Sequence, residues 1–320
     1  MPGPTTSRTT TAKQRLSARL RRVPSAPEST PEMGIHSARV DSIETLGRLR
    51  QSLLLAELAN IAYLPMQPVL QLVGPLGFDQ VEFYDRDGSQ AYRLENRTDC
   101  VIVCRGTEPT EWNDIKADVN AMSVIAETIG RVHRGFKKEV DDLWPLVEQA
   151  LANNAKTLWF AGHSLGGAMA TICAGRCFLS HIRSMPHALY TYGSPRVGNR
   201  AYINHCDIDH IRWVNNNDIV ARVPPPWFGY RHSGREMYLN TDGQLRRLNG
   251  WQRTKDRIRG FLGGLRQFRV DPISDHQMGC YIESILRMVL EYEASGLEEG
   301  LWIREKKRRG RNMTNVVIGG

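Results

Sequence analysis

The segment from residue 157 to 167 constrains the fold more than any other part of the chain. Residues 158–161 are all apolar and predict a buried strand, and they are followed directly by Gly162-His163-Ser164-Leu165-Gly166-Gly167. Small residues at 165–178 then predict a helix. A strand can pass into a helix this abruptly only where glycines remove the Cβ atoms that would collide. The segment therefore predicts a tight strand-to-helix turn with a serine at its apex.

Other apolar segments alternate with helical ones along the chain. Residues 100–104 form a continuous apolar run, which is typical of a strand buried on both faces of a sheet. Further strands are predicted at 81–84, 92–94, 188–192 and 211–214, and helices at 44–63, 136–151 and 277–292. This alternation predicts an α/β fold with a mostly parallel, doubly wound sheet flanked by helices.

A serine at such a turn is a poor nucleophile unless a base and a carboxylate activate it. With this kind of turn, the three groups follow the order serine, carboxylate, histidine along the chain. Asp218 follows the predicted strand 211–214 directly, at the sheet edge where catalytic groups collect. Asp207 and Asp209 precede that strand and lie at its wrong end. Asp218 is therefore the predicted carboxylate.

Four histidines follow the turn far enough along the chain to be considered as the base. His205 and His210 precede Asp218, which is the wrong order. His276 begins the last predicted helix, where a late loop would deliver the base, and it is the preferred candidate. His232 lies between these positions and stays open as the alternative.

An oxyanion intermediate needs at least two hydrogen-bond donors. One is the backbone N–H of Leu165, the residue after the nucleophile. The second is predicted in the loop after strand 100–104, where Thr107 offers a backbone N–H and a hydroxyl. His163 is predicted to point into the sheet packing in a structural role. These groups need no metal or organic cofactor, so the residues indicate a cofactor-free serine hydrolase with Ser164 as its nucleophile.

Six motifs occur in a fixed order between about residues 50 and 295: Arg105-Gly106-Thr107, Val132-His133-Arg134-Gly135-Phe136, the turn at 162–167, Tyr192-Gly193-Ser194-Pro195-Arg196-Val197-Gly198-Asn199, Asn217-Asp218 with Val223-Pro224-Pro225, and Asp275-His276 with Tyr281. Together they resemble the class 3 lipases, a family of fungal triacylglycerol lipases and plant acylhydrolases. The resemblance implies an α/β-hydrolase fold, a triad of Ser164, Asp218 and His276, and oxyanion donors at Thr107 and Leu165. It also implies a lid at 108–121.

The resemblance implies that the protein cleaves carboxylic esters of lipids through an acyl-enzyme. A phospholipase, a galactolipase or an acyltransferase could use the same triad, and a lipase-like binding protein without turnover is a further alternative. Five charged residues occur in the predicted lid, so shorter or more polar esters are also open as substrates: Glu108, Glu111, Asp114, Lys116 and Asp118.

Net charge points to anionic surfaces as partners. The formal charge is +8, and residues 246–269 hold eight basic residues against one acid, with apolar residues among them. This basic segment predicts either an amphipathic stretch that docks on an anionic membrane or a surface insertion packed on the body. Basic residues interleaved with aromatic residues in the RNA-binding manner are absent from the sequence, so nucleic acid is not an expected partner.

Composition divides the chain into three predicted parts. Residues 1–40 read as a flexible basic tail rich in Ser, Thr and Pro, residues 41–299 as the hydrolase domain, and residues 300–320 as a basic tail. The first 30 residues show no apolar stretch of a secretory signal, so a cytoplasmic location, with contact to membranes, is expected. The six cysteines lack zinc-ligand spacing, and the pair Cys173 and Cys177 is interpreted as two buried thiols.

Overall fold

The computed structural model describes residues 34–106, 122–180, 182–216, 218–247, 251–252 and 276–304. Thr107, the predicted lid at 108–121, and most of the basic segment and of both tails lie outside these residues. The chain divides into a short unit, Met1–Gly34, and a large unit, Ile35–Gly320, to which all the described helices and strands belong.

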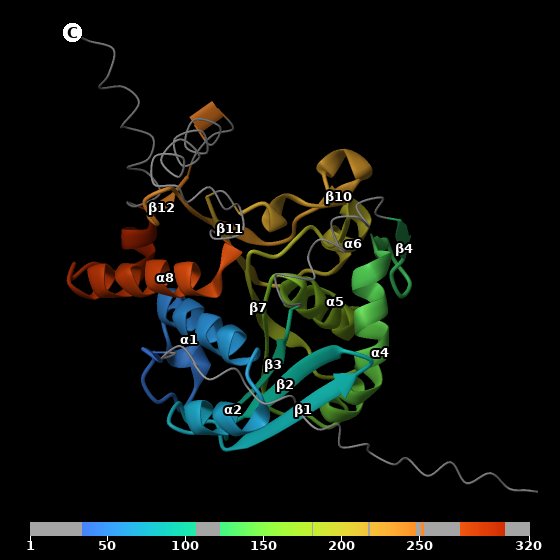
Figure 1. Ribbon diagram of the computed structural model, residues 1–320, viewed down its shortest axis with the longest axis horizontal. Helices are drawn as coiled ribbons and strands as arrows, with labels where there is room; N and C mark the ends of the chain where they lie inside the picture. Colours follow the sequence, from blue (N-terminus) through green and yellow to red (C-terminus); the bar gives the residue numbers. More distant parts are fainter. Residues whose placement is uncertain are drawn as a thin grey trace, which may run out of the picture. The chain divides into compact units, whose positions relative to one another are not determined.

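An eight-stranded sheet lies at the centre of the large unit, with the strand order β1-β2-β3-β6-β7-β9-β11-β12 (Figure 1). The strands are β1 (Gln80–Arg86), β2 (Ser89–Glu95), β3 (Asp99–Cys104), β6 (Thr157–His163), β7 (Pro186–Tyr192), β9 (His210–Asn215), β11 (Arg235–Leu239) and β12 (Leu245–Arg246). The run from β3 to β11 is parallel, and the strands at both edges are antiparallel. The predicted mostly parallel sheet is confirmed.

Helices cover both faces of this sheet. They are α1 (Arg48–Ile61), α2 (Met66–Val73), α4 (Arg134–Leu151), α5 (Leu165–Leu179), α6 (Arg200–His205) and α8 (Met278–Glu293). Helices α4 and α5 pack against each other over one face, while α1 packs against α8 on the other (Figure 1). Hydroxyls of Tyr190 and Tyr192 reach α1, where they donate to Gln51 Oε1 at 2.5 Å and to the Ser52 carbonyl at 2.6 Å.

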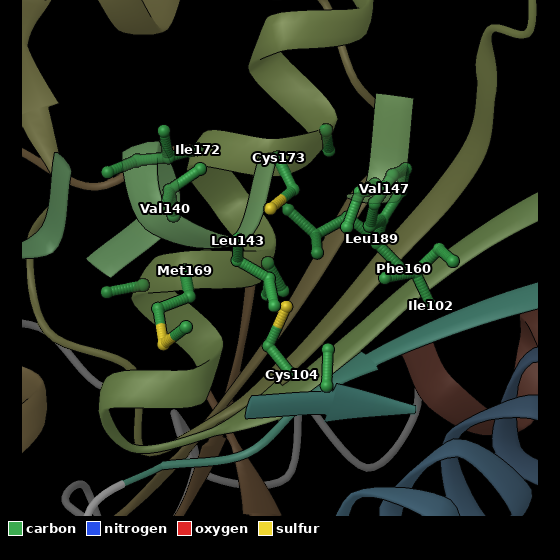
Figure 2. Packing of buried hydrophobic residues seen from close by; sticks show 14 of the residues in the cluster. Ile102, Cys104, Val140, Leu143, Val147, Phe160, Met169, Ile172, Cys173 and Leu189 are labelled. Atoms are coloured by element: carbon green, nitrogen blue, oxygen red, sulfur yellow. The ribbon is translucent and has the colours of Figure 1, made fainter. Parts of the chain in front are cut away.

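The hydrophobic core under α4 and α5 is built from alternate residues of the strands and from residues three or four apart on the helices. Alternate strand residues such as Ile102, Phe160 and Leu189 point to this face. Helix α4 supplies residues at the helical spacing of three and four, among them Val140 and Leu143 (Figure 2). Five cysteines are buried as free thiols, and all five belong to this core: Cys100, Cys104, Cys173, Cys177 and Cys206.

A second sheet lies beside the main one, with the order β10-β8-β5-β4. Its strands are β10 (Tyr230–Arg231), β8 (Gly198–Asn199), β5 (Arg131–His133) and β4 (Ser123–Ile125). Strands of two or three residues are too short for an alternating pattern, and the sequence did not predict this sheet. Short 3-10 turns η1 (Ile43–Thr45), η3 (Val220–Arg222) and η4 (Pro226–Phe228) complete the described elements. No described helix has the length and apolar character needed to cross a bilayer.

His210, at the start of β9, shows how the sheet uses a buried histidine. Its Nε2 lies 2.8 Å from Thr191 Oγ1, and its Nδ1 lies 2.7 Å from Ser233 Oγ. Burial, with a smaller contribution from the charge of Arg212, lowers the pKa of His210 from 6.5 to about 3. The imidazole is therefore a neutral crosslink between β7, β9 and the segment that follows β10.

This pKa shift predicts a loss of stability in acid. Below pH 6.5 the unfolded chain binds a proton at His210 that the folded chain does not, so this residue alone lowers the unfolding free energy by about 1.4 kcal/mol per pH unit. In urea titrations, His210→Gln should make the fall in unfolding free energy between pH 6 and pH 4 shallower by about that amount per unit. Above pH 7.5 the two proteins should show equal slopes. Equal slopes in acid would contradict a neutral buried His210.

Candidate active site

Ser164 occupies a strained position between β6 and α5. Its backbone has φ 59° and ψ −130°, and Asp87 in the β1–β2 turn is the only other described non-glycine residue with a positive φ. Such a conformation costs about 1–3 kcal/mol and persists only where surrounding contacts hold it. One of these contacts is the Ser164 N–H, which donates to the Tyr192 carbonyl at 2.9 Å.

Glycines beside Ser164 allow three backbone segments to touch. A Cβ atom at Gly162 would overlap the carbonyl of Gly166, and a Cβ atom at Gly166 would overlap the carbonyl of Cys104 at the end of β3. A Cβ atom at Gly106 would lie 2.8 Å from the His163 carbonyl. The turn is thus packed against the end of β3 without room for side chains.

The structure brings Asp218 and His276 together. Asp218 follows β9, is fully buried, and accepts through Oδ2 from Nδ1 of His276 at 2.9 Å. The same oxygen accepts from the hydroxyl of Tyr281 on α8 at 2.6 Å, and Oδ1 accepts from the N–H of Val220 at 2.8 Å. Because Nδ1 carries the proton in this bond, Nε2 of a neutral His276 is the proton acceptor.

The nucleophile and this pair meet at the end of β7. Tyr192 binds the Ser164 amide, and the next residue, Gly193, contacts the pair: a Cβ atom there would lie 2.5 Å from Asp218 Oδ2 and 2.8 Å from His276 Nδ1. Ser164 Oγ is buried and makes no hydrogen bond within the described part of the chain. The hydrogen bond from Ser164 Oγ to Nε2 of His276, along which a proton would be transferred, is therefore not formed in this conformation. This is common in sites without substrate.

His163 has hydrogen-bond partners that the sequence did not predict. Its Nε2 lies 2.7 Å from the carbonyl oxygen of His276 and must donate to it, so Nδ1 accepts from the hydroxyl of Tyr63 at 3.0 Å. The two imidazole rings lie with their centroids 4.4 Å apart. Burial, followed by the neighbouring His276, lowers the pKa of His163 well below its usual range. His163 is thus a neutral ring that holds the backbone of the predicted base.

The structure describes two of the other three predicted residues, Leu165 and His232. Leu165 is the first residue of α5, where the backbone N–H has no acceptor within the helix and the helix dipole favours negative charge. Thr107 lies outside the described residues. His232, the alternative base, binds the Ala221 carbonyl at 2.8 Å rather than Asp218. Among the described residues, no three His, Cys, Asp or Glu side chains are arranged to hold a metal.

A strained serine on a strand-to-helix turn, next to a buried His–Asp pair at the carboxyl edge of a parallel sheet, is the arrangement of a serine hydrolase of the α/β-hydrolase fold. Residues 101–228 match the family described as lipase (class 3). The resemblance to this family that the motifs indicated is confirmed by this match.

Several curated relatives match parts of the chain. Toxin TseL of Vibrio cholerae is 31% identical over an alignment of 190 residues, and the match covers 46% of this chain and 30% of that protein. Secreted mono- and diacylglycerol lipase 1 of Fusarium solani is 37% identical over an alignment of 119 residues, and the match covers 34% of each protein. The chain therefore spans about a third of the length of these relatives.

A solved structure shares the fold. The lipase from Rhizopus microsporus var. chinensis superposes with a TM-score of 0.51 and is 24% identical, covering 68% of this chain and 84% of that one. The predicted α/β-hydrolase fold is confirmed.

Gly193 provides a direct test of the site. In Gly193→Ala, the added methyl group would displace the Asp218–His276 pair, and we expect kcat for a p-nitrophenyl ester to fall by about 10²–10⁴-fold. Gly88→Ala is the matched control, because Gly88 also has a positive φ but a Cβ atom there meets nothing within 4 Å. Gly88→Ala therefore shows the effect of placing a side chain at a positive φ without a steric clash, and any further loss in Gly193→Ala comes from the clash with Asp218 and His276. Full activity in Gly193→Ala would mean that the pair is not catalytic.

His163 can be tested by removing its two hydrogen bonds while keeping a ring of similar size. We expect His163→Phe to lower kcat by about 10–100-fold with a smaller change in KM, because the base is displaced while the substrate pocket is retained. Tyr63→Phe removes only the outer bond and should have a smaller effect. An unchanged kcat in His163→Phe would show that His163 only fills space.

Proposed function

We propose that the protein is a serine hydrolase that cleaves carboxylic esters of lipids, with acylglycerols as the first candidate substrates. The observation that carries this proposal is the 2.9 Å bond from His276 Nδ1 to the buried Asp218, next to a serine held at φ 59°. The match of residues 101–228 to the class 3 lipase family supports it, and a relative from Fusarium solani is named a mono- and diacylglycerol lipase.

The reaction would begin when the ester carbonyl lies against Ser164. Nε2 of His276 takes the hydroxyl proton while Oγ attacks the carbonyl carbon, which gives a tetrahedral oxyanion. The backbone N–H groups of Leu165 and Thr107 would stabilise this negative charge. As the ester bond breaks, His276 gives its proton to the leaving alcohol. Water then attacks the acyl-enzyme with His276 as base, and the fatty acid leaves.

The surroundings of His276 suit it to carry a transient positive charge. Asp218 provides a negative charge at hydrogen-bond distance, and Tyr281 and Val220 hold that carboxylate in place. His163 lies beside the ring but stays neutral, because burial disfavours its charged form. When His276 becomes an imidazolium in the transition state, Asp218 is therefore its counter-ion. The neighbouring ring of His163 is uncharged and does not repel it.

The same catalytic residues can act on lipids with different headgroups. A phospholipase or galactolipase would use the same three residues, and the net charge of +8 favours anionic phospholipids as a second substrate class. A binding protein without turnover is disfavoured because Ser164, Asp218 and His276 are all present. Hydrolysis rates on diacylglycerol, phosphatidylglycerol and galactolipid, compared at equal ester concentration, would rank these classes.

Replacement of the nucleophile tests the proposal itself. Ser164→Ala should lower kcat on p-nitrophenyl esters by about 10⁴-fold or more, because triad members act as a unit. Acyl chains from butyrate to palmitate would be compared in the wild type to separate short-chain from long-chain preference. Circular dichroism would establish that the variant is folded. A folded wild-type protein without activity on any ester would contradict the proposal.

A further inference from the structure

A turn near the candidate site holds two large aromatic side chains in solvent. This aromatic turn, residues 224–231, includes Trp227, which is 79% exposed, and Phe228, which is 52% exposed, with ring centroids 6.4 Å apart. Adjacent exposed aromatic residues are uncommon on proteins without a partner, because they leave a large apolar area in water. The aromatic turn is therefore a candidate docking surface.

Backbone contacts fix the aromatic turn in place. Arg231 donates from Nη1 to the Pro226 carbonyl at 2.7 Å, and Arg196 donates from Nη1 to the Pro224 carbonyl at 3.1 Å. The Phe228 N–H donates to the Pro225 carbonyl at 3.1 Å. Because proline fixes φ and both arginines brace carbonyls of the turn, the aromatic rings are presented at a set position.

The aromatic turn is joined to both the site and the second sheet. It follows Asp218 through η3, whose Val220 N–H binds that carboxylate. It ends in β10, which belongs to the same sheet as β4, and Figure 1 shows both strands at one end of the large unit. Ile125 on β4 is 61% exposed and pairs across the strands with Arg131 on β5. Cross-strand partners point to one face, so an apolar and a cationic group lie together there.

The segments 194–206 and 219–235 of this surface carry only basic charged side chains, and the acid between β4 and β5, Glu127, is ion-paired with Arg176 at 2.7 Å. No acidic residue occurs between residues 219 and 235 or between residues 194 and 206. Arg131, Arg200 and Arg231 are exposed. Exposed aromatic rings with flanking cations match the headgroup region of an anionic bilayer, where tryptophan is favoured and basic side chains meet lipid phosphates.

We propose that the aromatic turn and strand β4 dock the protein on anionic lipid bilayers. Trp227 and Phe228 enter the boundary between headgroups and acyl chains, while Arg131 and Arg231 face the phosphates. The inference deepens the proposed function, because it places the site at the surface where lipid esters reside. Its test uses binding alone, so it can succeed or fail independently of ester hydrolysis.

The experiment measures co-sedimentation of the full chain with vesicles, in a Ser164→Ala background that prevents turnover. Vesicles of phosphatidylcholine alone and with 30 mol% phosphatidylglycerol would be compared. We expect Trp227→Ser with Phe228→Ser to lower the partition coefficient on the anionic vesicles by at least about tenfold, the effect of withdrawing part of two aromatic side chains from the bilayer. Both side chains are exposed, so the melting temperature should be unchanged.

The matched control is Trp251→Ser. Trp251 is 63% exposed and lies in the basic segment 246–269, the other predicted docking region. We expect this variant to bind within twofold of its parent. Normal binding by the double variant, or loss of binding in Trp251→Ser instead, would overturn the proposal.

A second readout covers the case of a double variant that does not fold. In Trp227→Phe, quenching of tryptophan emission by brominated phosphatidylglycerol should decrease, because Trp227 is the ring placed in the bilayer. Unchanged quenching would overturn the proposal. A wild-type dimer in solution that Trp227→Phe dissociates would assign the surface to a second copy of the chain and would also overturn it.

Discussion

The site depends on a place where three backbone segments touch with no side chain between them. The end of β3, the end of β6 and the first turn of α5 meet at Gly162 and Gly166, where a Cβ atom would overlap a carbonyl. This contact holds Ser164 at φ 59°, a conformation that the residue would otherwise leave. The parallel sheet supplies the contact, because β3 and β6 are paired neighbours that end together at this edge. The packing of β3, β6 and α5 therefore maintains the strained backbone conformation of Ser164.

A buried carboxylate organises the other half of the site. Asp218 would be costly without partners, and its oxygens accept from His276, from Tyr281 and from the Val220 amide. These donors come from the loop before α8, from α8 itself and from η3, so one charge ties three separate segments to the end of β9. The same bonds that make the burial of Asp218 tolerable also set the orientation of the histidine ring.

Chain order and strand ends explain what the sequence could predict. The motif at 162–167 and the position of Asp218 after a buried strand are local signals, and the structure places both at one edge of the sheet. The second sheet carries no such signal, because its strands have two or three residues. The sequence predicts a structural role for His163 but not its two partners, because Tyr63 and the His276 carbonyl are 100 and 113 residues away along the chain. Thr107, the lid, the location and the domain limits stay predictions.

The bond between His163 and the His276 carbonyl has a mechanical consequence. His163 is covalently adjacent to Ser164, so the backbone of His276 is hydrogen-bonded to the residue next to that serine. Helix α8 begins two residues after His276, so the same bond fixes the start of this helix relative to Ser164. A single hydrogen bond thus links the positions of Ser164 and His276 directly, in addition to the bond from Tyr281 on α8 to Asp218.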